Sequence, residues 1–435
     1  MESLIISSIL MVVMLFMGVP IAICLGFGGM IGLYLFFGAP SLTISVQVMA
    51  STLQSFILLA IPLFITMGII LAKSGVGERI YKFFDTYLRH IPGGVGIATI
   101  CTCAVLAAMC GTSVAIAAMV GAFALSNLQK YGYSLPLSMG IIAGGGALGI
   151  LIPPSVPMIL YSSFSEESTG KLFISGIIPG LLAALLFCVY VSVVYRTYSR
   201  SKKEILPEKS SWEERIKVTK EAIWSLLIPV AIIIPLYTGL ATPTEIAALG
   251  ILWALIVGIF IYKDICIKDI FPIFEEGVLS SLMVLFIMCG AMVFGAAVTQ
   301  IGLSEVIKEM TMGSLSPIGF IIVTLLIIMV LGCFLEGAAI MLIILPIFLP
   351  TLIGFEINLI WYAVLLVIGI EIGLLTPPVG LNLYAIDGVA KNLGYKSNMT
   401  IAIKGIFPFV ILYLVAEIFV LIFPQLTLWL PSMMR

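Results

Sequence analysis

Residues 149–161 read GILIPPSVPMILY, and residues 373–384 read GLLTPPVGLNLY. The glycines that open the two stretches lie 224 positions apart, and so do Pro153 and Pro377. Paired prolines stop a helix, because each one lacks a backbone donor and clashes with the preceding turn. Two apolar halves that are interrupted at matching positions are typical of a secondary transporter, which builds its binding site from such breaks.

The composition around these stretches is that of a membrane protein. Of the 435 residues, 61% are hydrophobic and 10% are charged, and the mean hydropathy is +1.24. Apolar runs recur along the chain, and a run of about 18 residues is long enough to cross a bilayer. Helices are expected throughout, because every backbone group in lipid needs a local partner. The sequence therefore predicts an all-α polytopic membrane protein, and the net charge of −1 gives no reason to expect a nucleic-acid partner.

Catalytic chemistry is not indicated by the sequence. The 8 cysteines lie in apolar segments without a Cys-x-x-Cys pair, so we interpret them as packing residues rather than metal ligands. The chain has 1 histidine and no His/Glu/Asp spacing typical of a metal site. We therefore expect no enzyme activity and no organic cofactor, and we also disfavour a passive channel, because broken helices suit a closed site better than an open pore.

We divide the chain into two inverted-topology repeats, at 1–196 and 223–425, joined by a cytoplasmic amphipathic linker at 197–222. The first repeat is expected to hold an arm at 77–90, a paired segment at 93–130 and a broken span at 134–163. The second repeat is expected to hold the same elements in the same order, with the arm at 301–310, the paired segment at 314–353 and the broken span at 358–388. The simple spans are expected at 3–18, 20–37, 50–73, 171–196, 223–240, 243–262, 275–299 and 400–424.

Orientation follows from the basic residues. Each repeat has an odd number of crossings whether its paired segment crosses twice or forms a re-entrant hairpin, so the two repeats face opposite ways. With both termini outside, 18 of the 21 Lys and Arg residues lie inside, and only Lys171, Lys308 and Arg435 lie outside. This split agrees with the positive-inside rule.

The first paired segment contains a polar break at Gly111, Thr112 and Ser113. A break at membrane depth frees carbonyl and amide groups that lipid cannot satisfy. The helix that follows presents its positive end, which suits a carboxylate, and the preceding helix presents carbonyls, which suit a cation. The alternative is a small-residue helix contact in which a hydroxyl bonds to its own backbone.

The second paired segment carries Glu336 and Gly337 at the matching place. A carboxylate in so apolar a segment is costly and usually functional. Glu336 could bind a cation, carry a proton, or only cap the following helix. All three alternatives stay open from the sequence.

The two Pro-Pro breaks are the other candidate sites. Their unwound carbonyls are hard oxygen ligands, to which hydroxyl and amide side chains could add, and such sets match alkali or alkaline-earth cations. A proline kink without a ligand is the alternative. Glu371 and Asp387 flank the second break and could pair with polar neighbours. The candidate ligands at the breaks are Gly149, Pro153, Pro154, Ser155, Thr376, Pro377, Pro378, Gly380 and Asn382.

In their order and spacing these motifs resemble the large membrane subunit of tripartite ATP-independent periplasmic (TRAP) transporters, over roughly residues 5–425. The likeness rests on GVPIA at 18–22, IPLF at 61–64, GTS at 111–113, GILIPPS at 149–155, IPG at 178–180, EG at 336–337, LP at 345–346 and TPPVG at 376–380.

The resemblance implies sodium-coupled uptake of an organic acid, of the C4-dicarboxylate or sialic acid class, across the bacterial cytoplasmic (inner) membrane, with both termini periplasmic. It implies an elevator mechanism, in which two re-entrant hairpins and two broken helices form a transport domain that moves against a scaffold. A small four-helix membrane subunit and a periplasmic solute-binding protein would be the partners. An autonomous cation/proton antiporter, or an organic-anion symporter that works without a binding protein, is the alternative.

The resemblance also implies two sodium sites and no other cofactor. One site would join 111–113 to 153–155, with Ser113 and Ser155 near the ion. The other would join Glu336 and Gly337 to 376–380, with Gly337 and Thr376 near the ion. The chain departs from the common pattern by having Cys110 before the first break and Glu336 where Asp is usual.

Overall fold

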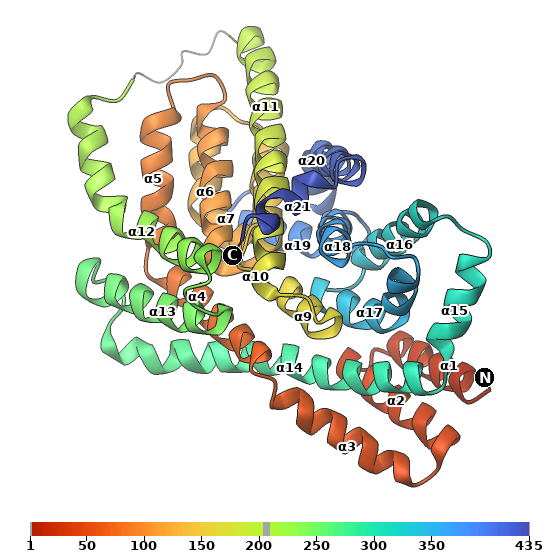
Figure 1. Ribbon diagram of the computed structural model, residues 1–435. Coiled ribbons are helices and arrows are strands. Elements are labelled where there is room, and N and C mark those ends of the chain that lie inside the picture. The colour runs from red at the N-terminus through yellow and green to blue at the C-terminus, as the bar shows by residue number, and fades with distance from the viewer. Residues whose placement is uncertain (1, 203–208, 435) are drawn as a thin grey trace.

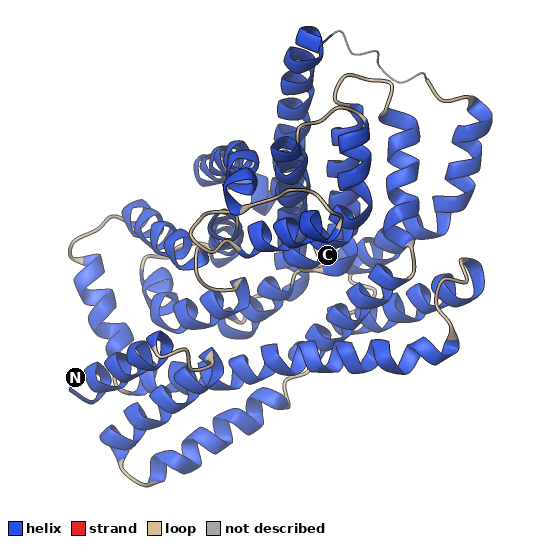
Figure 2. Ribbon diagram, turned by 180° about the vertical axis from the view of Figure 1, so that it is seen from behind, coloured by secondary structure: helices blue, strands red, loops and turns tan. Residues whose placement is uncertain are grey.

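The computed structural model describes residues 2–202 and 209–434, and every regular element in those ranges is a helix (Figure 2). Six of these helical segments are individually long and apolar enough to cross a membrane. The all-α polytopic prediction is confirmed. The six segments are Thr169–Thr197, Trp212–Thr238, Pro243–Ile261, Ile267–Gln300, Gly337–Gly354 and Met399–Ile422.

The first half of the chain runs from α1 to α11 (Figure 1). Its leading helices are α1 (Glu2–Phe16), α2 (Ile21–Phe37), α3 (Pro40–Leu53), α4 (Ala60–Lys73) and the amphipathic arm α5 (Val76–Leu88). The paired segment is α6 (Gly94–Cys110) with α7 (Ser113–Lys130), and the broken span is α8 (Leu135–Gly146) with α9 (Val156–Ser165). The half closes with α10 (Thr169–Ser175) and α11 (Ile177–Lys202).

The second half presents its elements in the same order. Its leading helices are α12 (Trp212–Thr238), α13 (Pro243–Ile256), α14 (Ile270–Gln300) and the arm α15 (Leu303–Met312). The paired segment is α16 (Pro317–Gly332) with α17 (Gly337–Gly354), and the broken span is α18 (Leu359–Leu374) with α19 (Leu381–Asn392). Helices α20 (Met399–Ile422) and α21 (Gln425–Ser432) close the chain. All four predicted interruptions are therefore present.

The span predicted at 50–73 is not one continuous helix. Two helices, α3 and α4, meet there at an angle of 59°, and α3 already begins at Pro40. A short 3₁₀ turn at Ile57–Leu59 joins them. Pro62 lies in the first turn of α4, where its missing backbone donor costs nothing, so it favours a helix start at this point. The matching helix of the second half, α14, is continuous over 31 residues.

The boundary predicted at residue 222 is not a break in the secondary structure. Helix α12 continues from Trp212 to Thr238 and holds Pro229 and Pro235 in its interior. Figure 1 shows its first part beside α5 and its second part turned toward α10. Prolines inside a helix bend it, which accounts for the change of direction. Residues 203–208 of the predicted linker lie outside the described residues.

Several packing contacts recur in the two halves. Helix α2 packs along α14, and the corresponding helix α13 packs along α4. Helix α7 contacts α19, and the corresponding helix α17 contacts α9. The long helix α14 runs along one edge of the molecule, with α2 and α3 beside it (Figure 1). The paired segments and broken spans contact one another, α17 also packs against α14, and the interruptions of these segments form the candidate site.

Candidate functional site

The tip of the first paired segment is built by a glycine. Helix α6 ends at Cys110, Gly111 has the left-handed φ of +72°, and Thr112 is extended before α7 begins at Ser113. A Cβ atom at Gly111 would lie 3.1 Å from the carbonyl oxygen of Pro154. The first tip therefore touches the first Pro-Pro break through its backbone.

The first broken span supplies the facing surface. Helix α8 ends at Gly146, and after a 3₁₀ turn the chain is not helical again until Val156. A Cβ atom at Gly149 would lie 2.9 Å from the Thr112 carbonyl oxygen and 3.0 Å from the Ser113 Cα. The structure thus brings together residues 111–113 and 149–154, as predicted for one site.

Ser155 caps the helix that follows the first break. Its side-chain oxygen accepts a bond from the Met158 backbone nitrogen at 3.4 Å, so it caps α9. Pro153, Pro154 and Ser155 are all buried. The prolines leave this stretch without two backbone donors, so its carbonyl oxygens outnumber its N–H groups. Such a stretch can offer oxygens to a cation.

The second tip meets the second break by direct hydrogen bonds. The backbone nitrogens of Val379 and Gly380 donate to the Cys333 carbonyl oxygen at 3.1 Å and 3.2 Å. A Cβ atom at Gly337 would lie 2.9 Å from the Ile370 side chain on α18. The sequence prediction grouped Gly337 with Gly380, and the structure brings their segments together through Cys333, which the prediction did not include.

Glu336 caps the helix that it precedes. Its Oε2 atom accepts a hydrogen bond from the Ala338 backbone nitrogen at 3.2 Å, and Glu336 is the N-cap residue of α17. The side chain is exposed. The capping alternative is therefore observed, and a role of Glu336 in ion or proton binding stays a prediction.

Thr376 and its neighbouring prolines form an open loop. The Thr376 hydroxyl donates to the Ile372 carbonyl oxygen at 2.5 Å, which leaves its lone pairs free to accept or to coordinate. Pro377 and Pro378 are exposed, whereas Pro153 and Pro154 are buried. The two breaks have similar sequences, but only the second is accessible from the surface.

Asn382 contacts the first arm of the second broken span. Its Nδ2 atom donates to the Glu371 Oε2 atom at 3.3 Å, and both side chains are 0% exposed. The Asn382 Oδ1 atom has no partner among the described residues, and its role as an oxygen ligand at the Thr376 loop stays a prediction. Asp387 pairs with Lys391 at 2.6 Å and accepts from Ser397 at 2.5 Å, which gives it a structural role. Glu371 is a carboxylate inside an apolar helix, and the sequence indicated it as a candidate for this reason. The sequence did not indicate that Asn382 is its partner.

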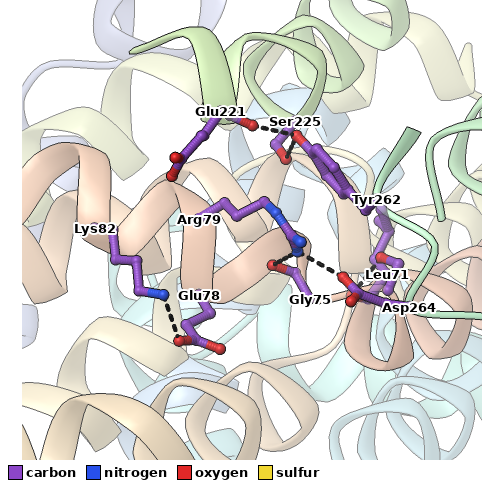
Figure 3. Close-up of polar contacts among 10 residues, drawn as sticks. Leu71, Gly75, Glu78, Arg79, Lys82, Glu221, Ser225, Tyr262 and Asp264 are labelled. Atoms are coloured by element: carbon purple, nitrogen blue, oxygen red, sulfur yellow. Dashed lines mark hydrogen bonds and ion pairs between the residues drawn. The ribbon is translucent and has the colours of Figure 1, made fainter. Parts of the chain in front are cut away.

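A separate polar cluster joins the first arm to the second half (Figure 3). We define the arm junction as Arg79, Tyr262 and Asp264. The Arg79 Nη1 atom lies 2.6 Å from the Asp264 Oδ2 atom, and the guanidinium stacks 3.9 Å from the centroid of the Tyr262 ring. The Tyr262 hydroxyl donates to the Glu221 carbonyl oxygen at 2.8 Å. A cleft of about 800 Å³ opens beside the junction, and its lining includes none of the predicted site residues. We interpret the junction as a structural link.

Asp85, near the end of the same arm, makes stability depend on pH. Burial raises the pKa of Asp85 to about 6, partly opposed by the charge of Arg89, with further effects from Glu214 and Lys130. An unfolded aspartate has a pKa of about 3.9. Between these two pKa values the folded state holds a proton on Asp85 that the unfolded state has lost. The free energy of unfolding therefore falls as pH rises from about 4 to about 6 and then levels off.

Asp85→Asn is expected to remove this dependence and to make the protein more stable than wild type above pH 6. Each pKa unit corresponds to about 1.4 kcal/mol, so the gain is on the order of 1–3 kcal/mol. Melting temperatures of the purified wild type and variant between pH 4.5 and 7.5 test this. Parallel curves for the two proteins would contradict the assignment to Asp85.

These features define a helical membrane transporter with two interrupted segments in each half. The fold is similar to that of the Alcanivorax borkumensis YdaH transporter, with a TM-score of 0.64, 15% sequence identity, and coverage of 89% of this chain and 90% of that chain. At this level of identity the likeness concerns the fold alone.

The family is shown by sequence comparison. The family model of the tripartite ATP-independent periplasmic transporter, DctM component, matches residues 8–426, and the chain belongs to this family. It is 32% identical to the C4-dicarboxylate TRAP transporter large permease protein DctM of Vibrio cholerae, over 98% of this chain and 97% of that protein. It is 35% identical to the DctM protein of Pseudomonas aeruginosa, over 88% and 87%. It is 30% identical to the sialic acid TRAP transporter large permease protein SiaM of Vibrio cholerae, over 97% and 96%.

The family resemblance stated from the motifs is thereby confirmed. The chain is a TRAP transporter large permease, a multi-pass protein of the bacterial inner membrane. Its relatives are transporter permeases rather than enzymes.

Proposed function

We propose that this chain is the permease subunit of a sodium-coupled, binding-protein-dependent transporter that imports an organic acid anion. The observation that carries the proposal is the pairing of each tip with its own break. Gly111 lies against Pro154, and Cys333 accepts bonds from Val379 and Gly380. Each pairing brings together backbone carbonyls, a helix C-terminus with its partial negative charge and a helix N-terminus with its partial positive charge. Such a place can bind a cation and an anion together.

These donors favour a hard cation, and sodium is the one that the family resemblance implies. The first site would take carbonyl oxygens from 149–155 together with the Ser113 and Ser155 hydroxyls. The second would take carbonyl oxygens from 333–337 and 373–380 together with the Thr376 hydroxyl. Oxygen-only sets of this kind bind hard cations, and no group of three His, Cys, Asp or Glu side chains suited to a metal ion occurs within the described ranges.

The anion would be bound by the N-terminus of α7. Helix α7 begins at the first tip without a side-chain cap, and a helix N-terminus carries a partial positive charge, whereas the N-terminus of α17 is already capped by the Glu336 carboxylate. The names of the relatives point to C4-dicarboxylate or sialic acid as the substrate class. Carboxylates of either class match this arrangement of donors.

The transport movement that we propose is an elevator motion of inverted repeats. The equal order of elements in the two halves and the reciprocal contacts of α2 with α14 and α13 with α4 support two related halves. The paired segments and broken spans would form the moving domain, and α5 and α15 would connect it to the scaffold. With both termini periplasmic, the linker would face the cytoplasm.

Two partners belong to the proposed function: a small four-helix membrane subunit and a periplasmic solute-binding protein. Reconstitution with both partners tests the proposal. Uptake of labelled succinate or sialic acid into proteoliposomes is expected only with an inward sodium gradient and with the binding protein present. Uptake that needs neither would favour the autonomous antiporter or symporter.

Ser113→Ala and Thr376→Ala are each expected to reduce uptake about tenfold or more, because each removes one oxygen ligand from a proposed sodium site. The apparent sodium affinity should fall in both variants, while insertion into the membrane is preserved. Sodium titrations of uptake, normalised to the amount of protein in the liposomes, measure the effect. Wild-type rates and sodium dependence in both variants would remove these hydroxyls from the sites.

A further inference from the structure

Glu371 is a fully buried carboxyl group without enough partners. It lies on α18, two residues before Gly373, and its relative exposure is 0%. The Oε2 atom accepts one hydrogen bond, from Asn382, and the Oε1 atom has no hydrogen-bond partner among the described residues. A buried carboxylate that lacks partners is strongly destabilising, so such a group either takes up a proton or is neutralised by a bound cation.

Asn382 has the same deficiency on the facing element. Its Nδ2 atom is used by Glu371, and its Oδ1 atom is buried without a partner in the described part of the chain. Asn382 belongs to α19, so the two unpaired oxygens come from the two arms of the second broken span. An amide that donates to the carboxylate while its own oxygen stays free suits a further group of positive charge.

Two hydroxyl groups complete the surroundings. Ser113, at the start of α7, interacts with the Glu371 carboxyl group and is 3% exposed. Tyr413 on α20 lies within electrostatic range of Glu371, is 0% exposed, and its hydroxyl has no partner within the described residues. Side chains from α7, α18, α19 and α20 therefore lie near the buried Glu371 carboxyl group.

We propose that Glu371, Asn382, Ser113 and Tyr413 form an additional site for a monovalent cation. This proposal rests on the proposed sodium-coupled function and adds a site at which a carboxylate holds the ion. The Glu371 and Asn382 oxygens bind the cation directly, the Tyr413 hydroxyl adds to its oxygen shell, and Ser113 is shared between this site and the first proposed sodium site. Because Ser113 comes from the first tip and Glu371 from the second broken span, the cation joins the two halves.

The charges in the cluster select the class of ion. One carboxylate balances one monovalent cation, whereas a divalent cation would leave a net positive charge at a buried site. The set contains no nitrogen or sulfur ligand, and hard oxygen donors favour alkali metals over transition metals. Sodium, the proposed coupling ion, is the candidate that the site would bind during transport.

Equilibrium binding of radioactive sodium to the purified permease, together with its small membrane subunit in lipid nanodiscs, tests this site. Wild type is compared with Glu371→Gln. This substitution keeps the size of the side chain and an oxygen that can accept the hydrogen bond from the Asn382 amide, and it removes the negative charge. The variant is expected to bind one sodium ion fewer per permease, with a less steep dependence on sodium concentration. Glu417→Gln is the matched control, because Glu417 is also a buried glutamate with an unpaired oxygen, at 4% exposure on α20.

The outcomes separate this inference from the proposed function. If wild type binds no sodium, the proposed function fails and the additional site fails with it. If wild type binds sodium and Thr376→Ala lowers the number of bound ions, but Glu371→Gln does not, only the additional site is overturned; a proton on Glu371 would give this result. If Glu371→Gln cannot be purified as a folded protein, Asn382→Ala decides by the same measurement, and an unchanged number of bound ions overturns the site.

Discussion

Gly373→Ala is expected to lower the stability of the protein by about 3 kcal/mol or more, because the backbones of α16 and α18 touch at this residue. A Cβ atom at Gly373 would lie 2.5 Å from the Gly332 Cα and 2.8 Å from the Met329 carbonyl oxygen. Backbone atoms cannot move aside as a flexible side chain can, and overpacking typically costs about 1–3 kcal/mol or more. Glycine at helix contacts in membranes permits this kind of close approach.

Gly369→Ala provides the matched control on the same helix. A Cβ atom at Gly369 would have its nearest neighbour at 3.4 Å, an oxygen of the Glu417 side chain, which is an ordinary contact. The melting temperature of the purified protein, followed by tryptophan fluorescence, should fall for Gly373→Ala and change little for Gly369→Ala. Equal melting temperatures for the two variants would show that α16 and α18 are not in backbone contact.

Gly380→Ala is expected to reduce uptake more than tenfold while the protein still inserts and folds. Gly380 has a φ of +59°, a conformation that costs most other residues about 1–2 kcal/mol. A Cβ atom there would also lie 3.1 Å from the Thr376 carbonyl oxygen and 3.3 Å from the Leu374 carbonyl oxygen. These are carbonyl groups of the proposed second sodium site, so the substitution displaces ligands as well as straining the loop.

Gly388→Ala tests whether the position, rather than the loss of any glycine, is responsible. Gly388 lies in α19, the helix that Gly380 precedes, and a Cβ atom there would meet nothing within 4 Å. This variant should transport at the wild-type rate. Uptake and its sodium dependence in proteoliposomes distinguish the two variants, and wild-type transport by Gly380→Ala would exclude a role of the loop in ion binding.

The interruptions of the helices could be predicted because their causes are local. Proline removes a donor wherever it stands, and Gly111 allows the left-handed turn that ends α6. The bend between α3 and α4 was missed because residues 53–57 contain neither glycine nor proline. The 3₁₀ turn at that bend packs against α9 and α13, so contacts distant in the sequence determine where the helix stops.

The partners of the site residues were harder to predict than their identity. The resemblance paired each tip with its break, and the backbone contacts of Gly111 and Cys333 agree with that pairing. The direction of the Asn382 side chain could not be foreseen, since it depends on how α19 is rotated against α18. The same holds for Ser113, whose interaction with Glu371 links segments that are far apart in the sequence.

The two arms are attached by different forces. Helix α5 is tied to the second half by ion pairs at both ends, from Arg79 to Asp264 at 2.6 Å and from Arg89 to Glu214 at 2.8 Å. Helix α15 packs against α17 and makes no ion pair within the described residues. Raising ionic strength from 0.01 M to 1 M shortens the Debye length from about 30 Å to about 3 Å. Added salt would therefore weaken the attachment of α5 to the second half and leave the packing of α15 against α17 unchanged. In the elevator motion proposed above, the two arms would then respond differently to the same solution.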